Sequence, residues 1–442
     1  MFHDSDALLA WGRTLRGRHA VAHPAWRDQV GGDVALGARH AGGVLPVGLG
    51  RSYGDSGLNV GGAAIVTTGL DRLIAFDPHT RLLRAEAGLS LAALLDIVVP
   101  RGFFPPVTPG SRYVTLGGAL ANDVHGKNHH GAGTFGRWVR RFGLVRSDGV
   151  ERTIAADDET GLFAATIGGL GLTGLVTWVE VELLPIVSAM IRAETVAFAN
   201  LPEFFDVARQ SDAAWDYTVA WIDCLASGVN FGRGIFTRGR HAASGPLLAA
   251  RPAPGRRMPV DAPGGLLNRH TVRAFNALYY ALGRRGAGSR TLSYLPFFYP
   301  LDAIGQWNRL YGRHGFYQYQ SVVPPDVALD ATAAMLGAIA ASGQGSFLAV
   351  LKTFGPLASP GMLSFPRAGT TLALDFRNRG AVTLALFDRL DDIVREAGGR
   401  LYPAKDGRIP AAMFRAGYPA WEGFARHVDP GFSSSFWRRV TA

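Results

Sequence analysis

Cysteine is nearly absent from this sequence, which has one among 442 residues, Cys224. A single thiol cannot form an intramolecular disulfide, so nothing indicates a disulfide-stabilised secreted domain, and Cys224 is expected to be an ordinary buried thiol. No apolar run reaches the roughly 20 residues of a membrane span. Residues 1–7 lack the basic start and apolar centre of a signal peptide. We therefore expect a cytoplasmic protein, with peripheral contact as its only association with a membrane.

Charged residues are also few, at 18%, and their balance is basic, with a formal net charge of +10. The arginines are scattered and form no recognition-helix, RNP-type or zinc-finger pattern, so nucleic acid is not an expected partner. A phosphorylated lipid or an anionic membrane surface suits scattered basic groups better. A coding bias towards arginine explains the charge equally well without any partner.

The remaining composition is that of a large packed protein. Hydrophobic residues make up 48% of the chain, which excludes a disordered polymer, and the length allows two domains. The 57 glycines exceed the average usage of about 7%. Such an excess fits a protein whose backbone approaches a ligand in several places.

The most informative segment spans residues 114–130 and combines Gly117-Gly118, amides, one carboxylate, one lysine and three histidines. The glycine pair lets a ligand lie directly against the backbone. His125 and Lys127 flank Gly126 and supply groups that carry or donate a proton. A metal site is not expected, because the segment has no cysteine, a single carboxylate and a Gly-rich rather than helical pattern. His129 and His130 are accordingly expected to be loop structure.

A second glycine-rich loop, residues 48–55, follows the apolar run 44–47, which predicts a short buried strand. Successive glycines allow backbone N–H groups to form an anion-binding nest. The spacing matches neither the G-x-G-x-x-G pattern nor a P-loop. Taken alone, the loop is explained as well by an ordinary surface turn.

The order of further elements gives these two loops a context. A strand is predicted at 82–88, and a helix at 91–99 with Ser90 as its N-cap, ended by Pro100 and Gly102. A Pro-rich stretch at 104–110 and a third glycine-rich segment at 168–176 follow. This series resembles the flavin-binding domain of the vanillyl-alcohol-oxidase superfamily.

Motifs along the chain narrow the resemblance to the decaprenylphosphoryl-β-D-ribose 2′-oxidase family. They run in order from about residue 9 to about residue 429, at 9–13, 48–55, 123–130, 307–309, 318–320, 363–366 and 404–406. The resemblance implies an α+β fold in which an FAD-binding domain (1–189), an antiparallel-sheet substrate domain flanked by helices (190–399) and a C-terminal return to the FAD-binding domain (400–442) follow one another. It also implies oxidation of the ribose 2′-hydroxyl of a polyprenyl phosphosugar with FAD as hydride acceptor. A short-chain keto-reductase would then complete epimerisation to the arabinose donor.

The pattern after residue 190 agrees with a substrate domain. Residues 217–223, 316–323, 346–353 and 370–376 alternate with period two, which predicts an antiparallel sheet with one face on helices and the other lining a site. An amphipathic helix is predicted at 384–395, stopped by Gly398-Gly399. The Pro/Gly/Arg-rich stretch 242–257 is expected to be a mobile surface loop.

Oxidation of a carbinol needs a base near the hydroxyl oxygen. Lys405, after a predicted strand, matches the family's active-site lysine, and His125 matches an active-site histidine. Lys352 ends an apolar strand and must reach water or meet an anion. Gln318 and Gln320 share one strand face, which suits sugar hydroxyls as well as bonds to backbone.

The resemblance implies the following site residues. Substrate contacts are expected from Lys352, Gln318, Gln320, Trp221, Lys127 and Tyr53. Cofactor contacts are expected from Gly48, Leu49, Gly50, Arg51, Ser52, Tyr53, Gly54, Asp55, Pro109, Gly110, Thr115, Gly117, Gly118, Ala121, Asn122, His125, Gly126, Asn128, Gly174, Val176 and Lys405.

Some positions depart from the family pattern. The first loop has Arg51-Ser-Tyr53 where many superfamily members carry a flavin-linked histidine, so FAD is expected to be non-covalent. Thr371 and Ala373 stand where mycobacterial members have Asn and Cys, and Phe298 replaces a tyrosine. Two alternatives stay open: an aldonolactone or alditol oxidase of the same superfamily, and a flavin-binding scaffold without activity.

Overall fold

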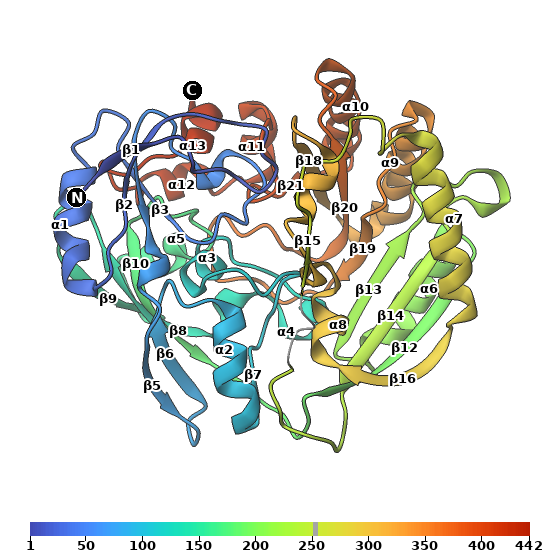
Figure 1. The fold of residues 1–442 in the computed structure, drawn as a ribbon, viewed down its shortest axis with the longest axis horizontal. Coiled ribbons are helices and arrows are strands. Elements are labelled where there is room, and N and C mark those ends of the chain that lie inside the picture. The colour runs from blue at the N-terminus through green and yellow to red at the C-terminus, as the bar shows by residue number, and fades with distance from the viewer. Residues whose placement is uncertain (251–254) are drawn as a thin grey trace.

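Two sheets form the N-terminal part of the molecule, residues 1–189, drawn at the left of Figure 1. The computed structural model describes residues 1–250 and 255–442. The first sheet has the order β1 (His3–Ser5), β2 (His19–Ala22), β4 (Ala63–Val66), β3 (Val44–Val47), with β4 parallel to both β2 and β3. The second sheet is antiparallel, in the order β5 (Leu73–Asp77), β6 (Leu82–Glu86), β10 (Leu175–Glu182), β8 (Val139–Val145), β9 (Glu151–Ala155).

Short helices and glycine-rich loops connect these strands. In helix α2 (Leu91–Val98), the Ser90 hydroxyl accepts a hydrogen bond from the Ala93 N–H, which confirms the predicted N-cap. The other helices are α1 (Arg27–Gly37), α3 (Leu116–Ala121), α4 (His129–Ala132) and α5 (Leu162–Thr166). A short antiparallel pair, β7 (Phe103–Phe104) with β11 (Leu184–Pro185), lies at the end of this part.

Helices α3 and α4 correct one sequence prediction, because the segment 114–130 was expected to be Gly-rich and non-helical. Thr115 caps α3 by accepting from the Gly118 N–H at 3.0 Å, and Leu116 and Leu120 of this helix are buried in the core of the N-terminal part. Capping and burial together outweigh the low helix propensity of the two glycines.

An eight-stranded antiparallel sheet forms the other half of the molecule (Figure 1). Its order is β16 (Gly288–Ser293), β12 (Met190–Phe198), β14 (Gly234–His241), β13 (Tyr217–Ile222), β19 (Ala349–Phe354), β20 (Gly369–Arg377), β18 (Phe316–Val323), β21 (Arg400–Leu401). The four alternating segments predicted as strands are β13, β18, β19 and β20, which confirms the α+β expectation for this region.

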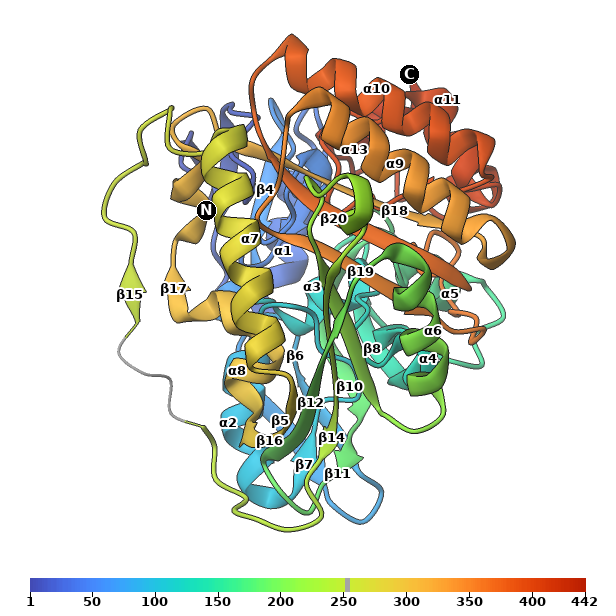
Figure 2. The same ribbon diagram turned by 90° about the vertical axis from the view of Figure 1, so that its right-hand side faces the viewer.

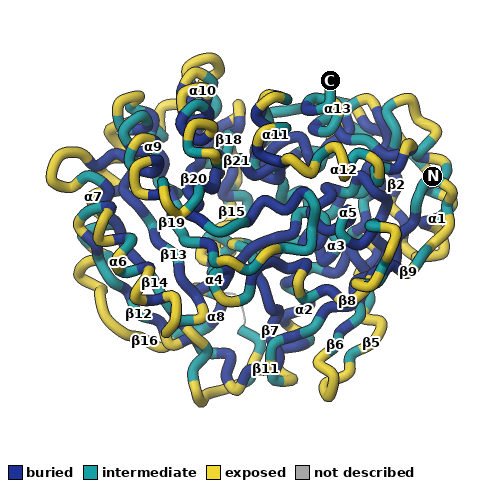
Figure 3. The backbone as a smooth tube through the Cα atoms, turned by 180° about the vertical axis from the view of Figure 1, so that it is seen from behind, coloured by how far each residue is buried: buried dark blue, intermediate teal, exposed yellow. Residues whose placement is uncertain are grey.

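Helices α6 (Leu201–Asp212), α9 (Ala328–Ser342) and α10 (Ala381–Glu396) cover one face of this sheet and bury the largest core against it. Helix α10 confirms the helix predicted at 384–395. Helix α7 (Arg269–Arg285) lies over the other face of β14 and β13 (Figure 2). There Gly283 approaches the side chain of Ile235. Helix α8 (Tyr294–Phe298) follows β16. Figure 3 shows α7 with more exposed residues than the strands beneath it.

The C-terminal segment joins both parts. Helices α11 (Ala411–Gly417), α12 (Trp421–Ala425) and α13 (Ser435–Thr441) lie beside the N-terminal strands in Figure 1, and Phe432 forms a β-bridge with Val44. The division into three segments, 1–189, 190–399 and 400–442, remains a prediction.

The expected loop at 242–257 is described only in part. Residues 251–254 lie outside the described residues. At its end, β15 (Arg256–Arg257) pairs in parallel with β17 (Ile304–Gly305), so this portion is a short strand. Cys224 is buried, as expected. In the part of the chain that the structure describes, no helix is long and apolar enough to cross a membrane.

Candidate active site

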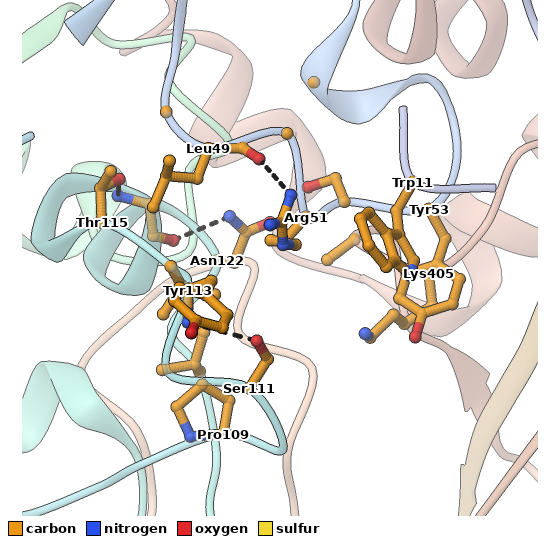
Figure 4. A pocket seen from close by; sticks show the side chains of 18 of the residues that line it. Trp11, Leu49, Arg51, Tyr53, Pro109, Ser111, Tyr113, Thr115, Asn122 and Lys405 are labelled. Carbon is orange, nitrogen blue, oxygen red and sulfur yellow. Dashed lines mark hydrogen bonds between the residues drawn. The ribbon is translucent and has the colours of Figure 1, made fainter. Parts of the chain in front are cut away.

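A cavity of about 640 Å³ lies between the N-terminal part and the eight-stranded sheet. One wall is made of the glycine-rich loops 48–53 and 109–118 with helix α3, and the opposite wall of side chains from β18, β19 and β20. Its volume is in the range of ligand pockets. Figure 4 shows Thr115 and Asn122 on one side and Trp11, Tyr53 and Lys405 on the other.

The first glycine-rich loop is joined directly to the segment that carries Lys405. The Tyr53 N–H donates to the Ala404 carbonyl at 2.9 Å. A Cβ on Gly54 would lie 1.5 Å from the Asp406 carbonyl oxygen, so only glycine permits this approach. Residues more than 350 positions apart in the sequence therefore meet at one edge of the cavity.

Arg439 of α13 forms ion pairs with both segments of this junction. Its guanidinium donates to both oxygens of Asp55 and, at 3.1 Å, to Asp406. These carboxylates hold the pKa of Arg439 above its ordinary value, against the effect of burial. Asp55 and Asp406 do not line the cavity. This ion cluster therefore positions the loop and the Lys405 segment rather than facing a ligand.

Strand register determines which side chains form the wall of the cavity on the eight-stranded sheet. Residues paired across antiparallel strands share a face, so Gln320, Ala373 and Val350 form one row, and Lys352 pairs with Thr371 in the next. All five line the cavity. The row continues to Trp221, which does not line the cavity; its indole N–H donates to the Phe347 carbonyl at 3.0 Å.

The chain has three lysines, Lys127, Lys352 and Lys405, and none of them is exposed. Burial lowers the pKa of all three, to about 7 for Lys127 and about 8 for Lys352. Lys352 adds repulsion to Lys127, and Lys405 adds it to Lys352. Concentrating these cations in the interior favours an anionic or electron-rich ligand beside them.

Lys405 lies with its ammonium nitrogen 3.9 Å from the centroid of the Tyr53 ring. Burial lowers its pKa, and the negative charge of Asp375 partly opposes this effect. Lys352 places its ammonium 3.5 Å from the Gly126 carbonyl oxygen. Lys127 turns away from the cavity, because its ammonium donates to the Phe297 carbonyl.

His125 is enclosed by the rings of Phe354, Phe365 and Tyr402. Its pKa lies well below the ordinary value because of burial first and of Lys352 second, so the imidazole is neutral. The Gln320 amide nitrogen lies 3.2 Å from Nε2, which makes Nε2 the acceptor and leaves the proton on Nδ1. Nδ1 has no partner among the described residues. His129 stacks against Phe354, and His130 contacts the Trp215 carbonyl.

Asp375 is a buried carboxylate that the sequence reasoning did not single out. The Gln318 amide donates to it at 2.5 Å and the Tyr311 hydroxyl at 3.4 Å. Burial raises the pKa of Asp375, and these hydrogen bonds and Lys405 oppose the rise. Asp375 could have been found from its position in strand 370–376, because alternation places it on the same strand face as Ala373, two residues earlier.

The structure brings most of the expected site residues to the cavity. Those that line it are Gly48, Leu49, Gly50, Arg51, Ser52, Tyr53, Pro109, Gly110, Thr115, Gly117, Gly118, Ala121, Asn122, His125, Gly174, Val176, Gln318, Gln320, Lys352 and Lys405. Those that do not are Gly54, Asp55, Gly126, Lys127, Asn128 and Trp221. The prediction missed several lining side chains, including Trp11, Ser56, Tyr113, Trp307 and Tyr402.

Comparisons with known proteins agree with this geometry. The model of a family described as an FAD-binding domain matches residues 19–155, which include the first glycine-rich loop and helix α3. The protein is an FAD-dependent oxidoreductase.

Full-length relatives define the family. A decaprenylphosphoryl-β-D-ribose oxidase of Mycolicibacterium smegmatis is 38% identical over 98% of this chain and 97% of its own length. The chain belongs to the decaprenylphosphoryl-β-D-ribose oxidase family. An uncharacterized protein in the mprA 5′ region of Streptomyces coelicolor is 33% identical over 80% of this chain and all of its own length. A D-lactate dehydrogenase of Anaerostipes hadrus is 23% identical over 37% of each chain.

The cavity fits FAD on structural grounds. Glycines at 48, 117 and 118 leave its N-terminal wall without bulky side chains. Ser56 Oγ and His125 Nδ1 belong to residues that line the cavity, and both atoms are buried without a partner in the described part of the chain. Buried polar atoms of this kind are normally satisfied, so they are suited to a polar ligand.

Proposed function

We propose that this protein oxidises the 2′-hydroxyl of a polyprenyl-phosphoryl-β-D-ribose to the 2′-keto sugar. The observation that carries the proposal is that Lys405, Lys352, Gln318 and Gln320 line the same cavity as the loops of the FAD-binding domain. The name of the M. smegmatis relative supports the ribose substrate.

The chemistry assigned to the chain's residues is proton removal and orientation. When bound, FAD accepts a hydride from the carbinol carbon. Lys405 in its neutral form takes the hydroxyl proton, and the lowered pKa makes that form accessible near neutral pH. His125 is the alternative base.

The glutamines are placed to accept hydrogen bonds from sugar hydroxyls. The Gln318 amide nitrogen donates a hydrogen bond to Asp375. The Gln320 amide nitrogen donates to His125 and, at 3.3 Å, to the Thr371 hydroxyl. Among the described residues no hydrogen bond is made to the carbonyl oxygen of either amide, so each oxygen can accept one from the substrate. Lys352 provides the positive charge for an anionic group of the substrate or cofactor. Tyr53, which lines the cavity, completes the proposed substrate contacts, while Trp221 and Lys127, expected as contacts from the sequence, do not line it.

FAD is proposed to be held without a covalent bond, because the first loop, residues 48–55, contains no histidine. Acid precipitation of the purified protein should release all of the flavin into the supernatant. Flavin that stays with the precipitate would contradict this part of the proposal.

The substrate is tested by anaerobic reduction of the flavin. Polyprenyl-phosphoryl ribose should bleach the absorbance of the bound flavin, while ribose, xylitol and D-lactate should not at the same concentration. Equal reduction by xylitol would favour an alditol oxidase, and no reduction by any sugar would favour a flavin-binding scaffold.

Two further parts of the proposal concern a partner enzyme and the location of the protein in the cell. A short-chain keto-reductase acts on the keto product, which should appear as the epimerised arabinose compound when both proteins are present with substrate. The protein works in the cytoplasm or peripherally on a membrane, where a lipid-linked substrate resides.

A further inference from the structure

Helix α7 presents an apolar stripe to solvent. We define this stripe as Phe275, Leu278, Tyr279 and Leu282, which are spaced i, i+3, i+4 and i+7 and therefore lie on one side of the helix. Their exposed fractions are between 43 and 59%. Large apolar side chains exposed singly are ordinary, but a contiguous stripe marks an interaction surface.

The stripe is not the side by which α7 is attached to the protein. That side carries the buried residues Val272 and Asn276, and the Asn276 amide donates to Asp223 at 3.0 Å. The Asn268 side chain caps the start of the helix. The helix is thus fixed on the sheet while its stripe stays partly exposed, so the exposure is not explained by fraying.

The charge of the chain segment that carries the stripe is of one sign. Between Asp261 and Asp302 the sequence has no Asp or Glu, while it has five arginines: Arg269, Arg273, Arg284, Arg285 and Arg290. All five are exposed; Arg269 and Arg273 are in the first two turns of α7, and Arg284 and Arg285 are in its last turn. An apolar stripe on a helix with arginines near both ends and no acidic residue of its own is complementary to an anionic lipid surface.

The stripe is linked to the cavity wall through packed side chains. The Tyr279 ring contacts Trp221 with centroids 4.6 Å apart, and Phe275 contacts Phe347 at 5.7 Å. Trp221 is paired with Val350, which lines the cavity. Beyond α7, the β15 and β17 segments lie beside the helix in Figure 2, and Arg257 and Ile304 of these strands line the cavity as well.

We propose that α7 docks this protein onto the surface of an anionic lipid bilayer. The apolar stripe enters the boundary between headgroups and acyl chains, and the arginines contact the anionic headgroups. Docking itself requires no assumption about the substrate. Its consequence, that a lipid-linked sugar reaches the cavity from the bilayer side, rests on the proposed function.

The test is co-sedimentation of the FAD-loaded protein with vesicles. Binding should occur with vesicles containing 30% phosphatidylglycerol in phosphatidylcholine, and should be at least tenfold weaker with phosphatidylcholine alone. The double variant Leu278→Ser/Leu282→Ser should bind the anionic vesicles at least tenfold more weakly. Arg284→Gln/Arg285→Gln should weaken binding by a similar factor at low salt and by less at high salt, because only the electrostatic part is screened.

A matched control uses apolar residues of similar exposure on other helices. Leu36 of α1, 52% exposed, and Leu329 of α9 are distant from α7 in sequence and lie on different elements. Leu36→Ser/Leu329→Ser should bind the vesicles as the parent does. Melting temperature and flavin content are measured for every variant, so that loss of binding is compared among folded proteins.

Equal binding by the parent and the Leu278/Leu282 variant would overturn the proposal, as would equal loss in the control. A parent dimer that the stripe variant dissociates, without vesicle binding, would assign the stripe to a second copy of the chain instead.

Flavin reduction separates this proposal from the proposed function. A short-chain, water-soluble phosphoribose substrate should reduce the flavin of parent and stripe variant at the same rate, while vesicle-embedded substrate should react at least tenfold more slowly with the variant. If the protein binds vesicles but neither substrate reduces the flavin, only the proposed function is contradicted. If the substrates reduce the flavin but the protein does not bind vesicles, only the proposed docking surface is contradicted.

Discussion

Replacing Lys405 with alanine tests the proposed base most directly. The change removes an amine that lies 3.9 Å from the centroid of the Tyr53 ring and whose pKa is lowered by burial. The backbone bonds of this segment, from the Lys405 N–H to the Tyr402 carbonyl and from the Tyr53 N–H to the Ala404 carbonyl, do not involve the side chain. We therefore expect the variant to fold and to retain FAD.

The magnitude follows from the usual contribution of a positioned acid or base, about 10²–10⁴-fold in rate. Because each tenfold change corresponds to about 1.4 kcal/mol, Lys405→Ala should raise the barrier to flavin reduction by about 3 kcal/mol or more. Stopped-flow reduction at saturating polyprenyl-phosphoryl ribose measures this step without the re-oxidation half-reaction.

Two companion measurements separate proton removal from simple charge. Lys405→Arg keeps the positive charge but has no proton to lose near neutral pH, so it should be as slow as the alanine variant. In the parent, the neutral amine is the active form, so the rate should rise with pH through a pKa below the ordinary 10.5 of lysine. Reduction of Lys405→Ala at the parent rate would refute the assignment and make His125 the leading base.

The remaining predictions concern other groups around the cavity. Lys352→Ala should raise the KM for the sugar substrate more than it lowers kcat, because its charge is assigned to binding. Asp375→Asn removes the negative charge that raises the pKa of Lys405, the proposed base, so the pH–rate profile of flavin reduction should shift to lower pH. Arg439→Ala leaves two carboxylates uncompensated and should lower the free energy of unfolding by about 3 kcal/mol in urea titration; an unchanged midpoint would contradict the proposed ion cluster. Cys224 is buried and its pKa is raised to about 12, so the native protein should resist maleimide while Ala373→Cys, placed on the cavity wall, should react.

Several features of the fold and site could be read from the sequence because they depend on local patterns. Alternation with period two placed Gln318 and Gln320 on one face of β18, and the structure has both on the cavity wall. Ser90 began its helix as expected, since a cap needs only the next three residues. The order of the glycine-rich loops carried a resemblance to a flavin-binding domain of a known superfamily, and the matched family model confirms an FAD-binding domain.

Tertiary structure decided which of these groups meet. Three contacts join positions that are far apart in the sequence. Lys405 contacts Tyr53, Gln318 donates a hydrogen bond to Asp375, and Arg439 pairs with Asp55 of the first loop. Such contacts depend on strand register and on the packing of whole elements, which no local pattern encodes.

The same distinction explains where sequence reasoning departed from the structure. Residues 116–121 became helical because burial of Leu116 and Leu120 and the Thr115 cap outweighed the propensity of glycine. Lys127 was grouped with His125 by its position in one motif, yet its side chain points to the Phe297 carbonyl while His125 lines the cavity. Residue types and spacing determined the family and the chemistry available to this protein, and the direction of each side chain depended on the packing around it.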